Sequence, residues 1–95
     1  MSWHRYFRKR TAYFYHITIR LKGYTVRLVS DPYKEDIGYE KHYYHILNWY
    51  KNTDEDTYEY KYSNGCDIIL RDQIIGITFM TEKRELKKGD RTVIQ

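Results

Sequence analysis

Residues 13–29 read YFYHITIRLKGYTVRLV, and apolar and polar side chains alternate on both sides of Lys22-Gly23. Alternation with a period of two predicts a β-strand, and its repetition after a glycine predicts an antiparallel return. We therefore expect a β-hairpin over residues 11–30, with Gly23 supplying a positive φ in the turn.

A two-residue turn determines which side chains of this hairpin lie opposite each other. The apolar face then carries the pairs Leu21–Tyr24, Ile19–Val26 and Ile17–Leu28. The other face carries the pairs Arg20–Thr25, Thr18–Arg27 and His16–Val29. The sequence thus predicts one face for the core and one basic face for the outside.

A helix is predicted over residues 39–51, because its large apolar side chains recur at helical spacing. The stripe consists of Tyr39, Tyr43, Ile46, Leu47 and Tyr50. A polar loop with three consecutive acids, Asp54 to Asp56, follows the helix.

A second hairpin is predicted after this loop, with Asn64-Gly65 as its turn. In its first strand, Tyr58, Tyr60 and Tyr62 alternate with Glu59 and Lys61. Its second strand is predicted at residues 66–70. A turn at residues 71–73 and a last strand at residues 74–81 follow. A two-residue turn places Ile69 with the tyrosines but Ile68 and Leu70 with the charged residues. We expect either that both faces are partly buried or that a bulge shifts the register.

The order β-β-α-β-β-β predicts an α+β fold, an antiparallel sheet with one helix packed on a face. The alternative is a small SH3-like or Sm-like barrel with an inserted helix, because residues 58–77 resemble the last strands of such barrels. Residues 1–95 are predicted to form a single domain. Its ends are a basic aromatic arm, 1–10, and a charged, mobile tail, 82–95.

The composition describes a small, aromatic-rich chain. Twelve of the 95 residues are Tyr, whose rings supply apolar area and whose hydroxyls need partners when buried. The single cysteine excludes an intrachain disulfide and suits a reducing compartment. With no apolar run of membrane-spanning length and no signal-peptide core, we expect a cytoplasmic protein. Ala and Pro occur once each, a bias typical of AT-rich genomes and thus of a phage or plasmid of a low-GC bacterium.

Charge is distributed unevenly along the chain. Residues 1–30 sum to +7 without a single acid, residues 31–72 to −5, and residues 73–95 to +2. The candidate binding residues are the cations of the first segment with one histidine: Arg5, Arg8, Lys9, Arg10, His16, Arg20 and Arg27. Such a surface attracts phosphates or acidic proteins, unless the acidic middle folds over it.

Other reactive residue types lack a supporting pattern. His42 and His45 stand at helical i, i+3 spacing, but a metal site needs a third ligand, such as His16, Cys66 or a carboxylate, and the spacing selects none. No nucleophile signature surrounds Cys66, and residues 54–56 lack the pattern of a calcium loop. We therefore expect neither a catalytic site nor a metal or cofactor.

Two functions follow as hypotheses. The first is a non-enzymatic regulator, adaptor or inhibitor that acts through protein–protein contacts, because Tyr, Trp and Arg dominate binding hot spots. The alternative is a nucleic-acid-binding protein that uses the basic arm and the basic hairpin face, with rings stacking on bases. Self-association as a homodimer through exposed sheet edges is a further alternative. No membrane partner is expected.

Overall fold

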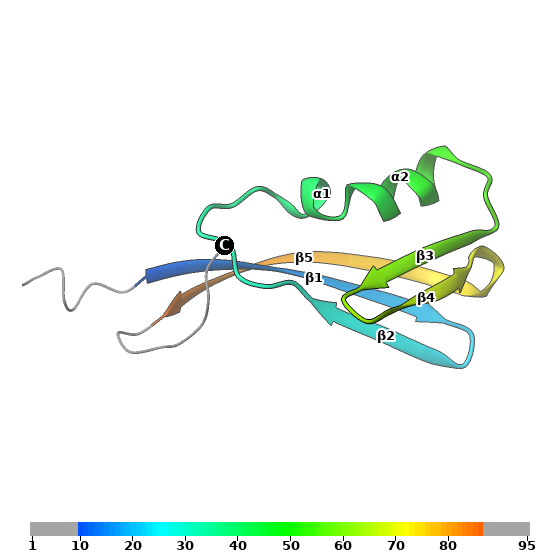
Figure 1. Ribbon diagram of the computed structural model, residues 1–95, viewed down its shortest axis with the longest axis horizontal. Coiled ribbons are helices and arrows are strands. Elements are labelled where there is room, and N and C mark those ends of the chain that lie inside the picture. Colours follow the sequence, from blue (N-terminus) through cyan, green and yellow to red (C-terminus); the bar gives the residue numbers. More distant parts are fainter. Residues whose placement is uncertain (1–9, 87–95) are drawn as a thin grey trace, which may run out of the picture.

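A computed structural model of the chain describes residues 10–86, and its strands form two antiparallel sheets with one main helical segment (Figure 1). The first sheet has the order β2-β1-β5, with β1 at Arg10–Leu21, β2 at Tyr24–Val29 and β5 at Ile74–Leu86. The second contains β3 at Thr57–Tyr62 and β4 at Gly65–Leu70. The expected single sheet is thus divided in two, and the two sheets do not close into the alternative barrel.

The first hairpin has the predicted register. Leu21 pairs with Tyr24, and each of the other five predicted pairs is present between β1 and β2. Gly23 has the expected positive φ, 99°. Local pattern and turn chemistry were sufficient here because a shift by one residue would turn every apolar side chain away from the core.

The last strand is longer than expected. β5 runs to Leu86 rather than ending at residue 81, because β1 begins at Arg10 and pairs with it along its whole length. Residues 82–86 of the predicted tail are therefore strand, and Arg10 is strand rather than arm. A register shift between Arg20 and Leu21 leaves Ile75 as an extra residue on β5.

The helical segment is broken in two. It consists of α1, Tyr39–His42, and α2, Tyr44–Asn52, with Tyr43 between them at φ −103° and ψ 28°. The predicted buried stripe is wrong at its end, because Tyr50 is exposed while Trp49 is buried. A turn of 3₁₀-helix, η2, at Arg71–Gln73 joins β4 to β5.

The core lies between the first sheet and the layer that covers its inner face. Tyr15, Ile17 and Ile19 of β1 pack against α2 and β4, which contribute Ile46, Trp49 and Ile69. A smaller cluster, Ala12, Phe14 and Leu86, lies at the other end of β1 and β5. The inner layer is α1, α2 and the β3–β4 hairpin (Figure 1).

Buried tyrosines have partners for their hydroxyls, as the composition required. The Tyr15 hydroxyl donates to the Asp36 carboxylate at 3.0 Å and accepts from the Ile37 amide at 2.7 Å. The Tyr43 hydroxyl donates to the carbonyl of Tyr15 at 2.7 Å. These bonds attach the loop before α1 and the α1–α2 junction to the central strand. No helix of the described residues is long and apolar enough to cross a membrane.

The second hairpin differs from the prediction in its turn and in its burial. Tyr62 pairs with Gly65, so Ser63-Asn64 forms the turn, and Ile68 lies opposite Glu59. Ile69 does lie on the side of the tyrosines. The other face is neither buried nor bulged: Ile68 is 62% exposed and Leu70 47%. Burial of both faces requires a strand inside a covered sheet, whereas β4 has only β3 beside it.

Candidate functional site

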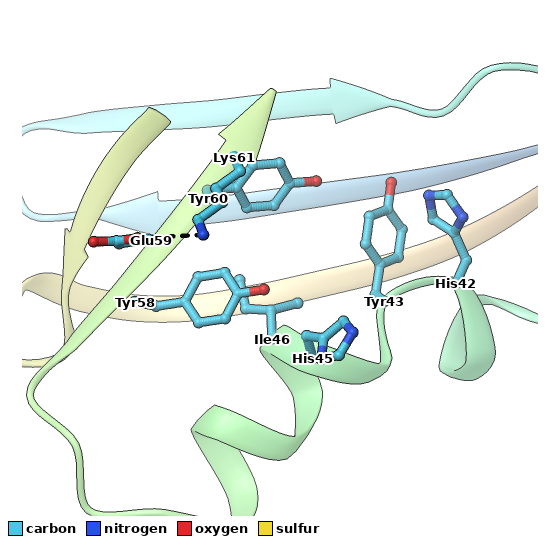
Figure 2. Close-up of a pocket in the computed structure, with 8 residues that line it drawn as sticks. All are labelled: His42, Tyr43, His45, Ile46, Tyr58, Glu59, Tyr60 and Lys61. Carbon is cyan, nitrogen blue, oxygen red and sulfur yellow. Dashed lines mark ion pairs between the residues drawn. The ribbon is translucent and has the colours of Figure 1, made fainter. Parts of the chain in front are cut away.

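An open cleft of about 590 Å³ lies between the helical segment and β3 (Figure 2). α1, α2 and the residue between them contribute His42, Tyr43, His45 and Ile46, and β3 contributes Tyr58, Glu59, Tyr60 and Lys61. Figure 2 shows the Tyr58 and Tyr60 rings extending from β3 toward the helices. Because alternate side chains of a strand lie on the same face, Tyr58 and Tyr60 enter the cleft together.

Most residues that line the cleft carry aromatic rings. Burial raises the pKa of Tyr43, Tyr58 and Tyr60, so all three hydroxyls remain protonated near neutral pH. Burial lowers the pKa of His42, and its Nδ1 lies 2.9 Å from the Tyr33 hydroxyl. Glu59 and Lys61 lie 3.8 Å apart at the rim. The cleft therefore suits an apolar or aromatic group that can accept hydrogen bonds.

The two helix histidines, His42 and His45, both line this cleft. Within residues 10–86, no three His, Cys, Asp or Glu side chains gather as metal ligands. The third ligands considered from the sequence lie elsewhere, since His16 is on β1 and Cys66 is exposed on β4. Asp54, Glu55 and Asp56 are exposed.

The predicted basic face is the outer face of the first sheet. His16, Arg20 and Arg27 project from this face, as the register requires, and Thr78 and Met80 of β5 lie beside them. Arg20 donates to the Thr78 hydroxyl at 2.7 Å and lies over Gly76. Arg10 is exposed at the start of β1. The candidates Arg5, Arg8 and Lys9 lie outside the described residues.

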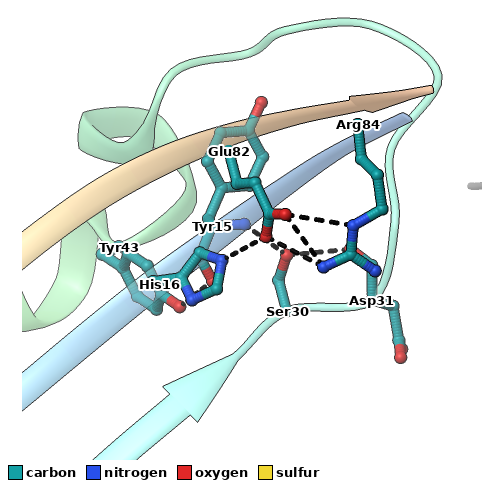
Figure 3. Close-up of polar contacts among 7 residues, drawn as sticks. All are labelled: Tyr15, His16, Ser30, Asp31, Tyr43, Glu82 and Arg84. Atoms are coloured by element: carbon teal, nitrogen blue, oxygen red, sulfur yellow. Dashed lines mark hydrogen bonds and ion pairs between the residues drawn. The ribbon is translucent and has the colours of Figure 1, made fainter. Parts of the chain in front are cut away.

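An acid from β5 partly neutralises this face (Figure 3). Glu82 lies 2.8 Å from His16 Nε2 and 2.9 Å from Arg84. Hydrogen bonds from His16 and then from Arg84 lower the pKa of Glu82. This acid belongs to the last segment of the sequence, not to the acidic middle. Glu82 lies opposite Phe14 in the β1–β5 pair, which places it on the outer face of the sheet. The sequence alone did not indicate that pairing.

The described outer face has no exposed aromatic ring. Phe14, the one Phe, Tyr or Trp among the described residues of this face, is buried, with the Arg84 guanidinium 4.3 Å from its ring centroid. Single-strand binders combine basic residues with exposed rings on which bases stack. The described part of this face supplies the first feature and not the second.

A second, smaller cavity lies between β2 and β4. Its volume is about 120 Å³, and it is lined by Tyr24, Val26, Leu28, Tyr60, Asp67, Ile68 and Ile69. We call it the β2–β4 pocket. Tyr24 is 64% exposed, so the pocket is continuous with apolar surface. Sequence reasoning missed this site, because it joins residues about forty positions apart whose hairpins belong to different sheets.

Comparisons with protein-family models, with curated proteins and with solved structures found no match for this chain.

Proposed function

We propose that this protein is a small, non-enzymatic binding protein that acts through protein–protein contacts, as a regulator, adaptor or inhibitor. The observation that carries the proposal is the apolar surface formed by Tyr24, Ile68 and Leu70. Tyr24 and Ile68 line one pocket, and Leu70 follows Ile68 on the same face of β4. Contiguous exposed apolar surface is typical of a site that another protein covers.

The energetics of so small a chain support this interpretation. A protein of this length has little apolar area available for its core, so large aliphatic side chains left in water are costly unless they serve binding. Burying one such side chain at an interface is worth about 1.5–3 kcal/mol. Surrounding tyrosines add large, half-exposed rings of the kind that dominate binding energy. In its proposed setting, a phage or plasmid of a low-GC bacterium, the partner would be a cytoplasmic protein.

The test is co-purification of the tagged protein from its native host, compared with two variants. Ile68→Glu places a charge on the proposed surface, whereas Met80→Glu makes the same change at an exposed residue of the outer sheet face. We expect a protein partner that is retained by Met80→Glu and lost by Ile68→Glu, with unchanged circular dichroism. A partner retained equally by both variants would contradict the proposal.

The nucleic-acid alternative has one observation in its favour, the exposure of Arg20 and Arg27 on a single face. Its test is a fluorescence titration with labelled DNA and RNA at low and high salt, since phosphate contacts weaken steeply with salt. Tight, salt-sensitive binding that Arg20→Ala/Arg27→Ala abolishes would favour this alternative. Absence of binding at low salt would refute it.

A further inference from the structure

β2 has a free edge. It pairs with β1 on one side and with no other strand of the described residues on the other. The Ser30 amide donates to the Tyr15 carbonyl, and Leu21 lies opposite Tyr24 across the turn. Even-numbered residues of β2 therefore bond to β1, and the N–H and C=O groups of Thr25, Arg27 and Val29 point outward. None of these outward groups bonds to another described residue.

This edge lacks the features that usually prevent strand pairing. Native edges are protected by lysine, proline or bulges. β2 contains no Lys or Pro, and its register with β1 is unbroken. β5, at the opposite edge of the sheet, has an extra residue at Ile75 and a lysine, Lys83. The contrast indicates that the β2 edge is suited to pairing.

The two faces beside this edge differ in chemistry. On the inner face, Val26 and Leu28 border the β2–β4 pocket, which has room for one apolar side chain. On the outer face, Arg27 is exposed, and Arg20 lies on the next strand. A strand added to β2 would place alternate side chains in these two environments.

We propose that the β2 edge binds an extended segment of the partner protein by strand addition, and that this segment alternates apolar with acidic residues. The inference rests on the proposed function and specifies its partner. Outward backbone groups of Thr25, Arg27 and Val29 supply the hydrogen bonds, as in other cases of strand addition. Apolar side chains face the β2–β4 pocket. Acidic side chains lie across from Arg27, where opposite charges stabilise a cross-strand pair and a lysine would be repelled.

The test uses the full chain and short capped peptides that carry a fluorescent label. In the first peptide Val and Glu alternate, in the second Lys replaces Glu, and in the third the residues of the first are reordered so that they no longer alternate. We expect the Val/Glu peptide to bind best and to protect the amides of Thr25, Arg27 and Val29 from hydrogen exchange. Equal binding of the three peptides, or no binding of the Val/Glu peptide, would overturn the inference.

Two variants separate the backbone contribution from the charge. Thr25→Pro removes one outward N–H but no bond to β1, and Thr25→Val is its matched control. The proline should weaken binding of the Val/Glu peptide about tenfold and the valine should not. Arg27→Glu should reverse the preference in favour of the Val/Lys peptide. An unchanged affinity of Thr25→Pro would exclude strand addition.

The outcomes also separate this inference from the proposed function. A natural partner that binds Thr25→Pro as tightly as wild type would overturn strand addition while leaving protein binding in place. Concentration-dependent protection of the β2 amides without any peptide would show that a second copy of the chain occupies the edge, and would overturn the inference too.

Discussion

Arg71 connects the end of the helical segment to the turn before β5, and its removal is the most informative test of the fold. Its guanidinium donates to the carbonyls of Trp49 at 2.8 Å, Thr53 at 2.9 Å, Glu55 at 2.9 Å and Tyr50 at 3.1 Å. It also lies 4.4 Å from the centroid of the Trp49 ring. The last carbonyls of a helix have no partner within the helix, and this one side chain bonds to two of them, those of Trp49 and Tyr50.

The expected cost of Arg71→Ala follows from these contacts. The bonds to Trp49 and Thr53 are partly buried, and each is worth about 1–1.5 kcal/mol. The stacking on Trp49 adds about 0.5 kcal/mol, and the two exposed bonds add little. We therefore expect a loss of about 3 kcal/mol in the free energy of unfolding, which corresponds to a fall in Tm of roughly 12–24 °C.

The assay is urea denaturation followed by circular dichroism and by tryptophan fluorescence. Arg71→Lys is the control, because it keeps the charge and the stacking but has no planar fork to reach several carbonyls. The free energy of unfolding of Arg71→Lys should lie between those of wild type and Arg71→Ala. A loss below about 0.5 kcal/mol for Arg71→Ala would refute the reasoning, since it would mean that the bonds to water in the unfolded chain are equally good.

Three further changes test other parts of the molecule. Tyr43→Phe removes a buried hydroxyl that is one of two donors to the Tyr15 carbonyl, the other being the Ser30 amide, so thermal unfolding should show a loss of about 0.5–1.5 kcal/mol. Gly76→Ala places a Cβ 2.5 Å from the end of the Arg20 side chain, which can move, so stability should change by less than about 1 kcal/mol while NMR shows Arg20 displaced. His16→Ala should raise the pKa of Glu82 toward its ordinary value of 4.5 in an NMR titration of the carboxyl carbon. Because the folded-state pKa is lowered, this carboxylate stabilises the protein above pH 4.5, and the stabilisation is lost as pH falls further.

The first hairpin could be predicted because its information is local. Alternating side chains and one glycine specify the register of residues 16–29, and the outward position of Arg20 and Arg27 follows directly. The existence of the second hairpin and of the helical segment could be predicted from the sequence equally well. Periodicity identifies an element because each element must bury one of its own faces.

Which element packs on a given strand or helix depends on residues distant in the chain, and this could not be predicted. The exposure of Ile68 depends on β4 standing beside β3 alone, outside the first sheet. Trp49 is buried in place of Tyr50, and the helical segment breaks at Tyr43, whose side chain bonds to the central strand. The turn at residues 71–73 was expected, but not its contact with the end of α2.

The sequence by itself determined the first hairpin, its two faces and the presence of a helix and a second hairpin. The tertiary structure alone decided that the strands divide into two sheets, that β5 extends along all of β1, and that β2 and β4 border one pocket. The physical reason is that strand patterns and turns depend on neighbours in the chain, whereas sheet edges and pockets depend on which distant surfaces bury the most apolar area together.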